Sequence, residues 1–161
     1  MHKQARGFTL IEVLITLVIV SVLATIAVPA YKNLIVSTRL SGELNALIGA
    51  LNIARSEAQK RGTTVKVCPG SAITCTTSWS GGWIVLLESS PRQKLMLRPA
   101  VGNGDTITSD VTTFPQFDAA GYTFFTGKLF INDRDNTATL RRCIVFSAGT
   151  WVTRRGILCD A

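Results

Sequence analysis

Histidine is almost missing from this chain, which has a single one, His2, among 161 residues. No Ser-His or Cys-His nucleophile pair is therefore available in the body of the chain. Metal-ligand patterns are missing too. The run NDRDN at Asn132–Asn136 lacks the glycine and the closing glutamate of a calcium loop, and such runs are ordinary turn formers. These absences argue against an enzyme or a metal centre, and no cofactor is expected.

Charge is missing from one long run near the N-terminus. The 23 residues from Phe8 to Ala30 contain a single charged side chain, Glu12. At a rise of about 1.5 Å per residue, a helix of this length is roughly 35 Å long, enough to cross a bilayer core of about 30 Å. We therefore expect residues 8–30 to form a transmembrane helix and residues 31–161 to form a globular domain.

Residues 1–7 read MHKQARG and predict a leader peptide. The expected processing point is Gly7, before the apolar run rather than after it. Removing the leader takes Lys3 and Arg6 from the 17 basic residues and leaves 15 against 10 acidic ones, a net charge of +5. The basic end is expected to stay in the cytoplasm of a single-pass inner-membrane protein, which places 31–161 in the periplasm.

The four cysteines include no CxxC pair, so a zinc site built from all four is the weaker of two explanations. Cys68, Cys75, Cys143 and Cys159 all fall in the part expected to be exported, where an oxidising compartment favours disulfides. Four cysteines allow three connectivities. Pairing Cys68 with Cys75 and Cys143 with Cys159 closes the shortest loops, but the sequence alone does not decide between the three.

Hydrophobic periodicity predicts an α+β fold, in which a long N-terminal helix packs on antiparallel β-sheet. The helix is expected from Phe8 to Arg61, kinked at Pro29. Its second half carries an apolar stripe formed by Leu40, Leu44, Leu47, Ile48, Leu51, Ala54 and Ala58. Strands are expected at Thr63–Cys68, Gly82–Glu88, Lys94–Arg98, Lys128–Asn132 and Thr139–Phe146. Trp79 and Trp83 are expected to cover an edge of the core rather than to stack on a sugar.

The N-terminal run RGFTLIEVLITLVIVSVLATIAVPAY, from Arg6 to Tyr31, resembles the signature of type IV pilins and type II secretion pseudopilins. The resemblance implies cleavage between Gly7 and Phe8 by a prepilin peptidase, N-methylation of Phe8, and a functional carboxylate at Glu12. It also implies the partners: other pilins or minor pilins in a filament, which the chain joins from the inner membrane.

Physical chemistry supports the role that the resemblance gives to Glu12. A carboxylate in lipid costs several kcal/mol unless it is partnered. Cleavage gives Phe8 a positive α-amino group, which Glu12 of a neighbouring subunit can meet as the helices pack. The alternative is a glutamate near the helix end that reaches the lipid headgroups.

The later motifs ARSEAQKRG, Cys68-Pro69 and WSGGWIVL resemble the GspH/FimT branch of minor pilins and pseudopilins. That family implies one α-helix with β-sheets against it. Some FimT-type members bind DNA for natural transformation through a C-terminal Gly-Arg-x-Arg motif. Here the similar stretch FSAGTWVTRRGILCDA keeps Gly149, but Thr150 and Val152 stand where the arginines would fall.

Arginine is nonetheless dense near the C-terminus, where residues 134–161 carry five arginines and two acids, a net charge of +3. Guanidinium groups match phosphate oxygens, and Trp151 offers a ring for stacking on a base. Sequence-independent contacts with double-stranded DNA are therefore assigned to Arg154, Arg155, Arg141 and Arg142. The first two are expected in a loop that a Cys143–Cys159 bridge would close.

The opposing hypothesis treats these arginines as ordinary surface charge and Trp151 as core. Arg141 and Arg142 in a strand place one side chain on each face, so they do not form one patch. We expect a FimT-like minor pilin of a type IV pilus that contributes to pilus tip assembly and binds DNA. The alternatives are a GspH-like minor pseudopilin of type II secretion and a purely structural or priming minor pilin.

Overall fold

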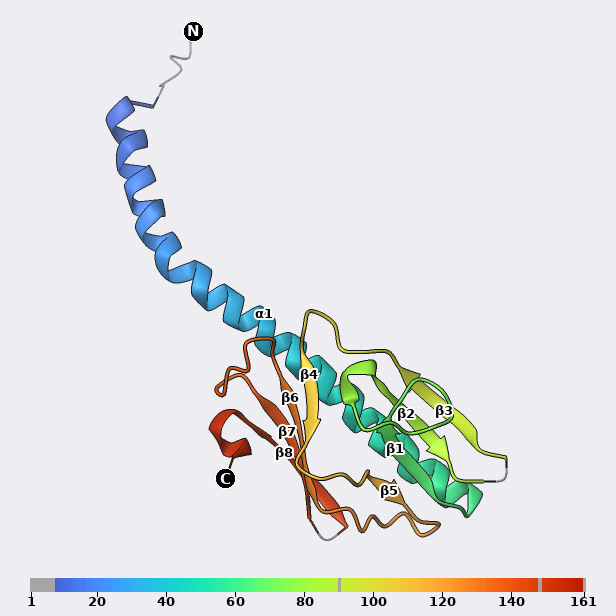
Figure 1. Ribbon diagram of the computed structural model, residues 1–161. Helices are drawn as coiled ribbons and strands as arrows, with labels where there is room; N and C mark the ends of the chain where they lie inside the picture. Colours follow the sequence, from blue (N-terminus) through green and yellow to red (C-terminus); the bar gives the residue numbers. More distant parts are fainter. Residues whose placement is uncertain (1–7, 90, 148, 161) are drawn as a thin grey trace, which may run out of the picture. The chain divides into compact units, whose positions relative to one another are not determined.

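The computed structural model describes residues 8–89, 91–147 and 149–160 (Figure 1). The chain divides into two compact units, one ending at Ile35 and the other comprising Val36–Ala161. Helix α1 (Leu10–Arg61) contributes to both units. The leader expected at residues 1–7, with the cleavage-site residue Gly7, lies outside the described residues.

The second unit contains two four-stranded sheets in which every pairing is antiparallel. Sheet A has the order β3-β2-β1-β5, with strands β1 (Val65–Pro69), β2 (Trp83–Leu87), β3 (Gln93–Arg98) and β5 (Gln116–Phe117). Sheet B has the order β4-β6-β7-β8, with strands β4 (Thr106–Ser109), β6 (Gly127–Asn132), β7 (Arg142–Ser147) and β8 (Thr150–Arg155). In the described part of the chain, two short 3-10 helices complete the fold, η1 (Trp79–Gly81) and η2 (Gly156–Cys159).

The α+β prediction is confirmed, and the five expected strands appear as β1, β2, β3, β6 and β7. The last of them begins at Arg142 rather than Thr139. The amides of Leu140 and Arg141 donate to the carbonyl of Thr137 at 3.0 and 3.2 Å and hold those residues in a turn. Strands β4, β5 and β8 are not among the strands expected from the sequence.

One hydrophobic core joins the second half of α1 to both sheets (Figure 1). Of the seven stripe residues that the periodicity predicts, six are buried and Ile48 is half-buried. Ala50 is buried as well, which widens the stripe. The two sheets face this helix with buried side chains such as Val67 and Val85 from sheet A and Leu129 and Ile144 from sheet B.

Two ion pairs join α1 to the sheets. The guanidinium of Arg39 donates to both carboxylate oxygens of Asp105, at 2.5 and 2.7 Å, and the Asp105 side chain is 1% exposed. This hydrogen bonding raises the pKa of Arg39. Arg98 of β3 donates to both oxygens of Glu43 at 3.1 and 3.3 Å. The Arg39 pair is bidentate and fixes geometry as well as distance, whereas Arg98 donates to both oxygens from a single nitrogen, Nη2. Both pairs help to hold α1 against the sheets.

The disulfides join Cys68 to Cys75 and Cys143 to Cys159, with Cα–Cα distances of 5.6 and 5.8 Å. These are the two short loops that the spacing favours, and no cysteine of the described residues is free for zinc. The first bridge also covers a small apolar cluster on the outer face of sheet A, formed by Cys68, Ile84 and Leu86.

Trp79 and Trp83 are 3% and 0% exposed and belong to the core. Trp79 meets the ring of Phe114 edge-on, with a centroid distance of 6.3 Å. Neither ring is available to stack on a sugar.

Candidate functional site

The first half of α1 exposes an apolar surface on all sides. Every residue from Phe8 to Ile35 is exposed, and most are large and hydrophobic. By length and composition this helix qualifies to cross a membrane. The second half of the same helix, in contrast, buries its apolar stripe in its own domain.

Hydroxyl groups within the apolar run are paired inside the helix. Thr16, Ser21 and Thr25 each donate to the carbonyl three residues earlier, at 2.8, 2.7 and 2.7 Å. A hydroxyl bonded in this way enters an apolar environment at little cost. The Glu12 carboxylate, in contrast, has no hydrogen bond or ion pair with the described part of the chain.

Thr9 and Glu12 occupy the two positions of a helix capping box. Because α1 begins at Leu10, Thr9 is the N-cap residue, and its hydroxyl accepts a hydrogen bond from the Glu12 amide at 3.3 Å. Thr-x-x-Glu is the sequence signature of this cap, so the cap is a feature that the sequence could have revealed. Phe8, just before the cap, is 82% exposed. Glu12 therefore stands where it can stabilise the helix start as well as carry a charge.

The four candidate arginines separate into two pairs on opposite faces of sheet B. Arg154 and Arg155 were expected in a loop, but they lie in β8, an edge strand. Cys143 is the register partner of Arg154, and Arg142 is the partner of Arg155. Since direct partners share a face and successive residues alternate, Arg154 lies on the outer face and Arg155 on the face toward α1. The four do not form one patch.

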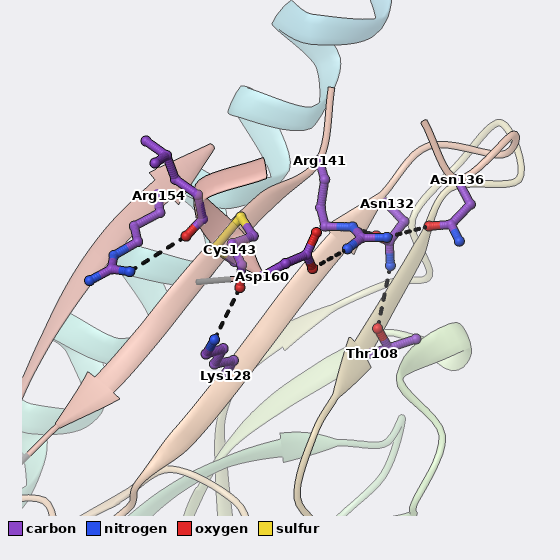
Figure 2. Close-up of polar contacts among 10 residues, drawn as sticks. Thr108, Lys128, Asn132, Asn136, Arg141, Cys143, Arg154 and Asp160 are labelled. Atoms are coloured by element: carbon purple, nitrogen blue, oxygen red, sulfur yellow. Dashed lines mark hydrogen bonds and ion pairs between the residues drawn. A yellow bond between two sulfur atoms is a disulfide. The ribbon is translucent and has the colours of Figure 1, made fainter. Parts of the chain in front are cut away.

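Arg141 ties the 132–136 turn to the C-terminal segment (Figure 2). Its guanidinium donates to Asn132 at 2.8 Å, to Asn136 at 3.2 Å and to the Asp160 carboxylate at 2.7 Å. Asp133 in the same turn accepts two bonds from Thr137, from its amide and its hydroxyl. Arg141 is thus occupied by protein partners.

Among the described residues, no cluster of His, Cys, Asp and Glu side chains could hold a metal ion.

Arg142 is the least accessible of the four, with 8% of its surface exposed. It donates to Ser37 and Ser41 of α1 at 2.8 and 3.3 Å and to the Leu140 carbonyl at 3.0 Å. A guanidinium buried in this way is poorly placed to contact the phosphates on the outside of a duplex, so Arg142 is the weakest of the four DNA candidates.

Several links hold η2 on sheet B. The Cys143–Cys159 bridge joins it to β7, and Lys128 Nζ donates to the Cys159 carbonyl at 3.2 Å. Arg154 donates to the neighbouring carbonyl, that of Leu158, at 3.5 Å (Figure 2). At the entry to η2, Gly156 has φ +61°, and a Cβ there would lie 3.2 Å from the Thr139 carbonyl oxygen. The C-terminal segment is therefore an ordered part of the domain.

Trp151 packs into the domain instead of presenting a ring for base stacking. Its ring meets Phe117 edge-on with a centroid distance of 5.8 Å, and the Arg55 guanidinium lies 5.4 Å from the ring centre. Trp151 is half-buried and packs against the core, with the Arg55 guanidinium over its ring and an edge contact to Phe117.

Comparison with known proteins identifies the family. Residues 43–150 match the family model "Type II transport protein GspH", and residues 2–28 match "Prokaryotic N-terminal methylation motif". The chain therefore belongs to the GspH family of type IV pilin-like minor pilins and pseudopilins.

Two proteins of Moraxella bovis are similar in sequence. The type IV major alpha-pilin is 47% identical over 55 residues, which cover 32% of this chain and 35% of that protein. Fimbrial protein Q is 36% identical over 102 residues, covering 62% of this chain and 60% of that protein. The matches thus span about a third and three-fifths of these relatives.

The fold is shared with the type IV minor pilin FimU of Pseudomonas aeruginosa. In one crystal form the TM-score is 0.55 at 20% identity, with 71% of this chain and 85% of that chain covered. In a second crystal form the TM-score is 0.53 at 21% identity, with 71% and 90% covered.

Proposed function

We propose that this chain is a minor pilin of a type IV pilus, anchored in the inner membrane by residues 8–30 before it joins the filament. One observation carries the proposal: α1 buries its second half in its own domain and exposes its first half completely. An apolar helix segment without a packing partner among the described residues needs lipid or other helices around it. Residues 31–161 would then form the periplasmic domain that the filament displays.

Phe8 and Glu12 are the proposed assembly residues. A prepilin peptidase would cut between Gly7 and Phe8, and the new α-amino group would be methylated. Glu12 has no partner of its own among the described residues, unlike the hydroxyls of the same run. In a bundle of such helices it would pair with the amine of a neighbouring subunit, because an unpaired charge in an apolar environment is costly.

The processing step predicts a defined mass. Chain isolated from membranes should have the mass of residues 8–161 with two disulfides and one added methyl group. The same kind of mass measurement follows cleavage in a Phe8→Ala chain. Phe124→Ala, which changes an exposed phenylalanine of the domain, is the matched control. An intact chain that retains residues 1–7 in wild-type cells would contradict the proposal.

The main alternative is a pseudopilin of type II secretion, which would use the same helix, cleavage and carboxylate. The two are separated by the phenotype of a deletion. Loss of surface pili with normal secretion supports the pilus, whereas loss of secretion with normal pili supports the pseudopilin.

Contact with double-stranded DNA is a second candidate function, and one observation favours it. Arg154 and Lys128 donate to adjacent carbonyls of η2, those of Leu158 and Cys159, so two cations lie close together on the outer face of sheet B (Figure 2). Arg154 is exposed, and the arginine fork suits phosphate. Such binding would be independent of sequence and would weaken with salt.

The DNA proposal predicts a salt-dependent affinity that Arg154 controls. Arg154→Gln should reduce the slope of log K against log salt by about 1, the value for one lost phosphate contact. Lys94→Gln, an equal charge change at an exposed position of β3 in sheet A, should leave the slope unchanged. Absence of binding by the full chain at low salt would leave a subunit that acts through protein contacts alone.

A further inference from the structure

Arg142 is a buried cation that no acid of the described residues neutralises. Its hydrogen-bond acceptors are the hydroxyls of Ser37 and Ser41 and the carbonyls of Leu140 and Arg141, all of them neutral. It has no ion pair with the described part of the chain. Neutral acceptors satisfy the N–H groups of a guanidinium but leave its charge uncompensated, which is unfavourable for a side chain that is 8% exposed.

A second cation lies beside it on the same face. Arg155 of β8 is the direct register partner of Arg142, and its guanidinium forms no hydrogen bond or ion pair with the described residues. Burial lowers the pKa of Arg142, and the charge of Arg155 lowers it further. Two neighbouring positive charges without a carboxylate destabilise the domain. A bound anion would compensate both charges and remove this cost.

The space for that anion is present. A cavity of about 490 Å³ is lined by Arg142 and Arg155, together with Ser37, Thr139, Ile157 and Leu158. Its rim is apolar, since Ile157 and Leu158 of η2 are 70% and 56% exposed. The site therefore combines cations within a pocket and hydrophobic side chains that point to solvent at its edge.

We propose that this cavity binds the phosphate of an anionic lipid headgroup, with Ile157 and Leu158 against the bilayer interface. The inference rests on the proposed anchoring by residues 8–30. Ser37 follows Ala30 by only seven residues along the chain, so a wall of the pocket is joined to the proposed anchor by a short stretch of α1. Guanidinium groups with adjacent apolar side chains match the phosphate and the interface of one lipid molecule.

The test uses the full chain reconstituted in two kinds of vesicle, phosphatidylcholine alone and equal parts of phosphatidylcholine and phosphatidylglycerol. Amide hydrogen exchange is followed at residues 157–160. We expect amide exchange of the wild type to be slower in the anionic vesicles than in phosphatidylcholine alone, by about fivefold for each arginine that binds a lipid phosphate. Arg155→Gln should lose this protection, whereas Arg134→Gln, the same change at an exposed arginine of the 133–136 turn, should keep it.

Flotation with the vesicles tests the membrane anchoring separately from the lipid pocket. Failure of the wild type to float would contradict the anchoring itself. Flotation with equal exchange in both kinds of vesicle would overturn the lipid pocket alone. Protection that appears only in assembled filaments, and not in anionic vesicles, would also overturn it and would assign the arginine pair to a carboxylate of another subunit.

Discussion

A Glu12→Gln chain is expected to fold, insert and be processed like the wild type, yet to be lost from the filament. Removing one partner of a buried charge pair costs about 3–5 kcal/mol, because the other charge stays unpaired. That corresponds to a drop of more than about 100-fold in incorporation. The quantity to measure is the amount of this chain in sheared filaments relative to the amount in membranes.

Glutamine is the informative substitution because Glu12 also belongs to the Thr9 capping box. Glutamine serves in that cap as well as glutamate does, so Glu12→Gln removes the charge and keeps the cap. Glu12→Ala removes the charge and the side-chain oxygens that could accept the reciprocal bond of the box, while the bond from the residue-12 amide to the Thr9 hydroxyl stays. Glu57→Gln, which breaks an exposed pair with Arg61 in the second half of the same helix, is the matched control and should incorporate normally. If the Glu12→Ala chain is lost from filaments while the Glu12→Gln chain is retained, residue 12 acts in capping, and the proposed charge pair is contradicted.

The second large effect concerns the Cys143–Cys159 bridge, whose loss should destabilise the domain by about 3 kcal/mol. The bridge spans 16 residues and fixes η2, with Ile157 and Leu158, against β7. A longer closed loop restricts the unfolded chain more than a short one does, so this bridge should contribute more than Cys68–Cys75, which spans 7 residues.

This prediction is measured without a substitution at the bridge. In a Cys68→Ala/Cys75→Ala variant of the full chain in detergent, a reductant breaks Cys143–Cys159 alone. Chemical unfolding of the oxidised and reduced forms then gives its contribution, and amide exchange at residues 157–160 shows whether η2 detaches. Equal unfolding midpoints and equal exchange in the two forms would contradict the role given to the bridge.

Local patterns predicted much of the fold. The spacing of Leu40, Leu44 and Leu47 along the chain predicted the buried face of α1, because helical periodicity is a local property. Strands β1, β2 and β3 followed from dense β-forming runs. In β8 all residues except Trp151 are exposed, so it lacks the alternation that marks a half-buried strand. β5 contains only Gln116 and Phe117, too few residues for a pattern.

The candidate site was predicted in part. The first half of α1, Phe8 and Glu12 follow from composition and from a resemblance to pilins. The pairing of Arg39 with Asp105 joins residues 66 positions apart, and only the folded chain brings them together. The same holds for Arg142 and Arg155. Their pairing depends on the register of β7 with β8, and a shift by one residue would place them on opposite faces.

Quantifying this chain in filaments sheared from wild-type cells tests directly whether it is a filament subunit. We expect the chain to copurify with the filaments as residues 8–161, at a low level relative to the main subunit. Its recovery only in membranes, in cells that carry abundant filaments, would contradict the assignment as a filament subunit.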